Sequence, residues 1–142
     1  MKRLVIAVLS ILLLSGMVSA QSASELPDPG SMPGDALYGL ERAQQGFQIA
    51  VASAPVLGSP AQEAQVRSDI ASERLAEAKA LADKNKTDEA ADLMKEYSNM
   101  SDKAIEAANR SGRKDVASTV EDNLDRNVEV LKDVKDKVPE QA

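Results

Sequence analysis

"SPAQEAQVRSDIASERLAEAKALADK", residues 59–84, predicts a long helix with a well-defined start. Ser59 is suited to the N-cap, Pro60 to the first helical position, and Gln62 completes a capping box. The apolar residues that follow recur with the period of a helix and share one arc: Val66, Ile70, Ala71, Leu75, Ala78 and Leu81. The pattern therefore predicts one amphipathic helix that runs to about residue 84.

Two arginines, Arg67 and Arg74, fall in the middle of this apolar arc. Arginines on an inward face either pair with carboxylates or extend their side chains to the edge of the core. We expect pairing, with Glu41 of the preceding helix as the preferred partner and an acidic residue of the last helix as the alternative. Binding of an anion is a third interpretation.

Three further helices are predicted by similar signals, over residues 36–54, 87–109 and 114–138. Thr87 is suited to cap the second of these and Gly112 to stop it. No segment alternates like a strand, and the connections are short, so neighbouring helices should be antiparallel. The predicted fold is an all-α, up-down antiparallel bundle of about four helices that occupies residues 34–142.

The stretch "PGDALYGLERAQQGF", residues 33–47, holds two of the three aromatic residues of the chain. We predict that it begins the fold and is not a ligand site. Phe47 should enter the seam of the bundle, and Tyr38 should pack on the other side with its hydroxyl near the surface. A helix that is apolar on more than one side is either surrounded by other helices or kept for a partner, and we expect the first. Gly39 and Gly46 share a face that lets another backbone come close.

The entry into this helix, together with "ASERLAEAKAL" (residues 71–81), resembles a family of exported helical domains, domain of unknown function 5667. The resemblance is best over residues 33–110. The family usually has a proline and a lysine where this chain has Gly39 and Glu41. The resemblance implies a helical fold in exported or membrane-tethered bacterial and archaeal proteins, and it implies no activity. It is carried by Pro33, Gly34, Asp35, Leu37, Tyr38, Leu40, Arg42, Arg74, Leu75, Glu77 and Ala78.

The first twenty residues have the pattern of an export signal. Lys2 and Arg3 precede an apolar run over residues 4–14, and small residues end at Ala20, where we expect cleavage. The run is shorter than the roughly 20 residues of a membrane span, which favours a cleaved signal. An uncleaved anchor is the alternative. Residues 21–33 are rich in Pro, Gly and Ser and predict an extended linker.

The composition excludes several kinds of chemistry. The chain has no Cys and no His, so it lacks Ser–His and Cys–His pairs and the usual zinc and copper ligands. Residues 83–94 resemble a calcium loop but have Asp88 where the loop requires glycine and Met94 where it requires glutamate. We expect no enzyme activity, no cofactor and no metal site. The net charge, −6 for the whole chain, disfavours nucleic acid and anionic membranes as partners.

Three Asn-x-Ser/Thr sequons occur, at Asn85, Asn99 and Asn109. They are candidate N-glycosylation sites in a host that has the machinery, and unmodified asparagine is the alternative.

These observations favour an exported, non-enzymatic helical module with a structural or binding role at the cell surface or in a periplasm. Its expected partner is a protein, either a second copy of itself or another surface protein. One alternative is a helical chaperone that holds apolar segments of client proteins. A second alternative is a weak divalent-cation binder that uses carboxylates.

The first prediction concerns export. Expression of the full chain in a secreting host should yield a mature protein that begins at Gln21, because the small residues up to Ala20 suit a signal peptidase. N-terminal sequencing of the exported protein checks this. A product that still begins at Met1 would establish the anchored alternative.

Overall fold

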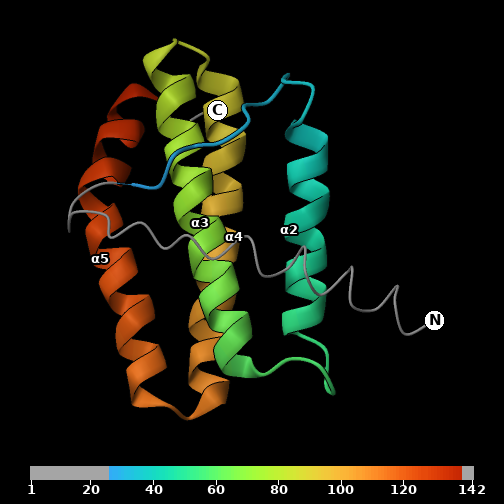
Figure 1. Cartoon of the computed structure of the whole chain (residues 1–142). Coiled ribbons are helices and arrows are strands. Elements are labelled where there is room, and N and C mark those ends of the chain that lie inside the picture. The colour runs from blue at the N-terminus through green and yellow to red at the C-terminus, as the bar shows by residue number, and fades with distance from the viewer. Residues whose placement is uncertain (1–25, 139–142) are drawn as a thin grey trace.

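The computed structural model describes residues 26–138, which form four helices and no strand (Figure 1). The helices are α2 (Tyr38–Ala52), α3 (Pro60–Asp83), α4 (Thr87–Ser111) and α5 (Lys114–Lys137). The predicted all-α bundle is confirmed. None of the helices in this range is both long and apolar enough to cross a membrane. The predicted signal peptide and the first part of the linker, residues 21–25, lie outside the described residues.

The start of α3 follows its sequence signal closely. Ser59 lies at the N-cap, and its hydroxyl oxygen accepts a hydrogen bond from the Gln62 backbone N–H at 3.3 Å. Gly112 closes α4 with a left-handed φ of 65°, a conformation that glycine adopts without strain.

The prediction that Thr87 caps α4 is wrong, because Thr87 is the first helical residue and Lys86 occupies the N-cap without a side-chain bond. The reason lies at the end of α3. Asn85 has a φ of 59°, and the Lys86 N–H bonds back to the Leu81 carbonyl at 2.9 Å. This pattern closes α3 and uses the whole connection, so α4 begins immediately after it.

The core is centred on α3, which packs against each of the other described helices and lies with α4 in the middle of the bundle (Figure 1). Leu75 is fully buried and belongs to one apolar cluster with Leu81, Leu93 and Val134. Much of the remaining interior is alanine, which allows α3 and α4 to approach closely. The most deeply buried alanines are Ala64, Ala71, Ala78, Ala90, Ala104 and Ala107.

The segment before α2 lies across α3 and joins the core (Figure 1). Leu26 and Met32 pack against the central cluster. The Ser31 N–H donates a hydrogen bond of 2.9 Å to the carboxylate of Glu41. Residues 26–33, although they have no regular secondary structure, therefore fix the position of the first turn of α2.

The prediction that the first helix is central is wrong. The backbone of α2 comes close only to α3 among the described helices, so α2 lies at an edge of the bundle. Phe47 is 57% exposed and Leu40 67% exposed, whereas the buried residues of α2 are Gln45 and Ala52. Phe47 therefore does not fill the seam. The surface of α3 that α2 covers carries polar groups, so α2 turns its own polar side inward.

The second prediction compares two large apolar side chains. Leu75→Ala should lower the free energy of unfolding by about 2–5 kcal/mol, because Leu75 is fully buried and the change leaves a cavity. Phe47→Ala should change it by no more than about 0.5 kcal/mol, since Phe47 is mainly exposed. Urea unfolding of the two variants in dilute solution measures both. Equal losses would show that α2 packs into the core in solution.

Candidate functional site

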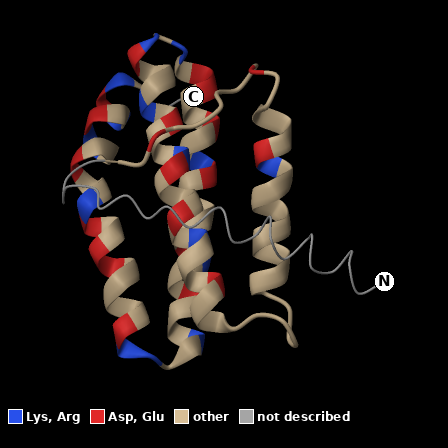
Figure 2. Cartoon of the chain, in the orientation of Figure 1, with Lys and Arg blue, Asp and Glu red and all other residues tan. Residues whose placement is uncertain are grey.

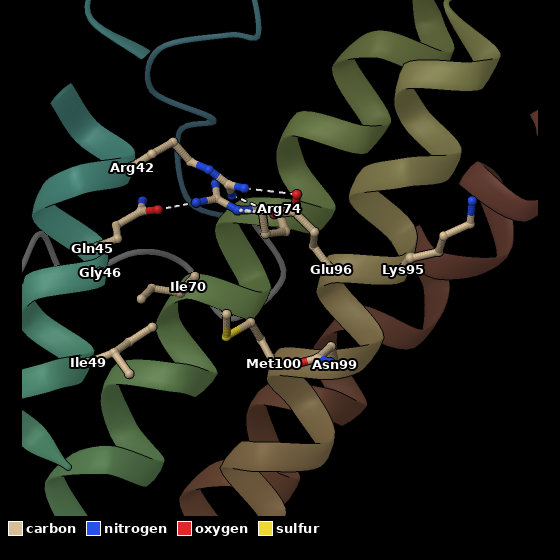
Figure 3. A pocket seen from close by; sticks show the side chains of 10 residues that line it. All are labelled: Arg42, Gln45, Gly46, Ile49, Ile70, Arg74, Lys95, Glu96, Asn99 and Met100. Atoms are coloured by element: carbon tan, nitrogen blue, oxygen red, sulfur yellow. Dashed lines mark hydrogen bonds and ion pairs between the residues drawn. The ribbon is translucent and has the colours of Figure 1, made fainter. Parts of the chain in front are cut away.

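A buried arginine, Arg74 of α3, lies at the centre of the junction between α2, α3 and α4 (Figure 3). The residue is 2% exposed. Its guanidinium is paired with the carboxylate of Glu77 and donates a hydrogen bond to the side-chain oxygen of Gln45 on α2. Its Nε lies 3.2 Å from a carboxylate oxygen of Glu96 on α4. One guanidinium thus holds groups from three helices.

Arg42 makes the second link between α2 and α4. Its guanidinium forms a bidentate pair with Glu96, with N–O distances of 2.5 Å and 2.8 Å. The same guanidinium lies 5.6 Å from the centre of the Tyr38 ring. The Tyr38 hydroxyl lies 3.4 Å from a carboxylate oxygen of Glu77, so it points inward and not to the surface as predicted. Polar contacts therefore provide much of the attachment of α2.

The other residues for which we predicted ion pairs, Glu41 and Arg67, have partners away from Arg74. Glu41 is not the partner of Arg74, because its carboxylate accepts the Ser31 N–H instead. Arg67 pairs with Glu63, one turn earlier on α3, at 2.8 Å, and Glu63 also pairs with Arg110 of α4 at 2.7 Å. The two arginines of the α3 arc therefore belong to two separate polar clusters, Arg67 with Glu63 and Arg74 with Glu77 and Glu96.

Sequence reasoning missed Gln45 and Glu96, both of which contact Arg74. A signal for Glu96 was present, since it precedes Tyr97 on the apolar stripe of α4 and so flanks the buried face. Gln45 gave no signal, because an uncharged amide among apolar residues has no preferred face.

The electrostatics of this cluster are dominated by desolvation. Burial raises the pKa of the Glu77 carboxyl from 4.5 to about 7, and the nearby Arg74 and Arg42 guanidinium groups offset only part of that rise. Burial also raises the pKa of the Tyr38 hydroxyl, and the charge of Glu77 adds to this effect. Protonated Glu77 is consequently present near neutral pH.

A pocket of about 480 Å³ lies between α2, α3 and α4 beside this cluster (Figure 3). Ile49, Ile70 and Met100 line its apolar part, and Arg42 and Glu96 lie at its polar end. The charged residues that line the pocket are all paired: Arg42 and Arg74 with Glu96, and Lys95 with Asp92. Its lining suits a small apolar group.

The opposite side of α2 is the second unusual surface. We define the outer face of α2 as Leu40, Ala43, Phe47 and Ala50, which share one side of the helix at 100° per residue. Leu40 and Phe47 are mainly exposed, and Ala43 and Ala50 are also exposed. The charges of α2 lie near its start, and the rest of the helix is uncharged, whereas the other helices carry charges along their length (Figure 2). No charged residue occurs from position 43 to position 62.

A family model described as "Domain of unknown function (DUF5667)" matches residues 30–141. The chain belongs to this family. The match includes all four described helices and the junction around Arg74. The comparison with curated proteins and the comparison with solved structures both give no match.

The remaining candidate positions of this DUF5667 chain lie on its surface. Asn85, Asn99 and Asn109 are all exposed, so each is accessible to a modifying enzyme.

Within residues 26–138, no group of three or more acidic side chains is arranged to hold a metal ion. In the 83–94 stretch, Asp83 pairs with Lys79 at 2.7 Å and with Lys137 at 2.6 Å.

The third prediction concerns pH. Because the pKa of Glu77 is raised in the folded chain, the folded state holds a proton that the unfolded chain releases above about pH 4.5. The stabilising contribution of this proton is complete below that pH and is lost as the pH rises through about 7. The stability of the native chain relative to Glu77→Gln should therefore fall by roughly 1–3 kcal/mol between pH 4 and pH 8.

Urea unfolding of both proteins across this pH range measures the difference, and Glu106→Gln, an exposed change on α4, is the control. A difference that stays constant or rises with pH would contradict the raised pKa.

Proposed function

We propose that this DUF5667 chain is an exported, non-enzymatic helical module that binds a protein partner through the outer face of α2. The observation that carries the proposal is the orientation of α2, which buries Gln45 and leaves Phe47 and Leu40 in solvent. Cell-surface or periplasmic location is part of the proposal and is supported by the pattern of an export signal at residues 1–20.

The energetics favour a partner for this face. Burying an exposed Leu or Phe side chain stabilises a complex by roughly 1.5–3 kcal/mol. The outer face of α2 offers two such side chains, and the adjoining connection adds Val56 and Leu57, which are 91% and 71% exposed. Contiguous exposed apolar surface of this kind commonly marks an interaction site.

The non-enzymatic part of the proposal is supported by the side chains at the α2–α3–α4 junction. The chain has no His or Cys to act as a nucleophile or as a base near neutral pH. Glu77, whose carboxyl has a pKa of about 7, is fully buried and bonded to Arg74 and Tyr38, so its carboxyl is not exposed to a substrate. The ionised groups at the junction, among them Arg42, Arg74 and Glu96, are paired with one another. Their arrangement attaches α2 to the bundle and leaves no charged group of the junction directed at a substrate.

The same exposed face also favours the chaperone alternative, in which it holds apolar segments of many clients. A chaperone should suppress the aggregation of a model client at stoichiometric concentration, and Phe47→Glu should abolish that effect. A module with one specific partner should leave the aggregation unchanged.

The fourth prediction tests the binding face in the exporting host. A photo-crosslinking amino acid placed at position 47 should form a covalent adduct with a protein, because this position lies on the outer face of α2. The same amino acid at position 128 is the matched control, since Val128 of α5 is also exposed, at 42%. Gel mobility and mass spectrometry identify the adduct. Equal adducts from both positions, or none from position 47, would overturn the proposal.

A further inference from the structure

The outer face of α2 follows a regular seven-residue pattern. Leu40 and Phe47 are seven positions apart. Ala43 lies three positions after Leu40, and Ala50 lies three positions after Phe47. Alternating spacings of three and four are the pattern of a helix that packs lengthwise against another helix. In this pattern large and small side chains alternate, and every one of these four residues is exposed in the single chain.

Two glycines, Gly39 and Gly46, lie along one side of this pattern, and Gly46 also borders the pocket beside Arg42. A Cβ atom at Gly39 or Gly46 would meet no other atom of the described chain within 4 Å. Each glycine costs a helix about 1 kcal/mol relative to alanine. Both residues lie beside the outer face, where the absence of a side chain allows a second helix to approach.

From these observations, and resting on the proposed function, we propose that the partner of this face is α2 of a second copy of the chain, packed antiparallel. When two such helices pack antiparallel, each first position of the pattern meets a fourth position of the partner helix. Phe47 of one copy then lies beside Ala43 of the other, and Leu40 lies beside Ala50. Each layer combines one large and one small side chain, so the layers have similar volumes. Gly46 faces Gly46 at the side of the contact.

The charge distribution allows a second copy as the partner of this face. A second copy carries the same net negative charge, −6 for the full chain and −8 without residues 1–20, so two charged faces would repel each other. The outer face of α2 is uncharged, and the helix directs Arg42 to Glu96 and Glu41 to the backbone of Ser31. Two copies can therefore meet on this face without bringing like charges together.

The size of the contact sets the expected strength. With 15 residues, α2 is about 22 Å long. Two helices that pack over this length bury less surface than the roughly 1,600 Å² of a standard protein interface. The dimer should consequently dissociate on dilution through the micromolar range.

A single engineered cysteine tests the geometry, because the chain has no cysteine of its own. In the antiparallel arrangement Gln44 lies next to Gln44 of the other copy, so Gln44→Cys should form a covalent dimer under mild oxidation. Gln48→Cys, on the same helix but away from the outer face, is the matched control and should form no covalent dimer. A parallel pair would place the two engineered thiols on opposite sides of the contact. Absence of the disulfide, or equal yields from both variants, would overturn the proposed packing.

Sedimentation of the mature chain tests the association itself. The average mass should rise from one chain towards two with concentration, and Phe47→Glu should weaken the association at least tenfold while the circular dichroism and melting temperature stay unchanged. Val128→Glu, an exposed change on α5, should leave the association unchanged. A mass of one chain at every concentration would overturn the inference. In that case an adduct between position 47 and a different protein would still support the proposed function.

Discussion

The burial of the Arg74 guanidinium is the constraint on which the arrangement of α2 depends. A charged group without partners in a protein interior is strongly destabilising, whereas a fully paired one is tolerated. Glu77 on the same helix supplies one partner, but Gln45 and Glu96 come from α2 and α4. The helices must therefore meet at this point, with the polar side of α2 directed inward.

The orientation of α2 has a direct consequence for its surface. The helix has apolar residues on more than one side, and only one side can face the bundle. Because the side with Gln45 is directed at Arg74, the side with Leu40 and Phe47 remains in solvent. Pairing the buried charge thus leaves an apolar face exposed, and that face is the basis of the proposed binding role.

The rest of the bundle does not need the large side chains of α2. Alanines at the interface of α3 and α4 allow the two backbones to approach closely, and Leu75, Leu81 and Val134 fill the remaining space with their neighbours. Such an interior is built from small residues at short distances and not from a few large ones. The buried residues of its two apolar clusters come from α3, α4 and α5, whereas α2 is attached mainly through polar contacts.

The sequence by itself determined the helices and most of their ends, because caps and periodicity depend on neighbouring residues. Ser59, Pro60 and Gly112 act within a few residues of their own positions, and the structure has them where the sequence predicts. Phe47 and Glu41 are different. Which side of α2 faces inward, and which carboxylate reaches Arg74, depends on residues up to 54 positions apart, as in the pair of Arg42 with Glu96. An apolar stripe shows only that a helix has a face to bury. Only the tertiary structure decided that α2 turns its polar side towards the buried charge of α3. Leaving a guanidinium unpaired in the interior costs more free energy than leaving a phenylalanine exposed.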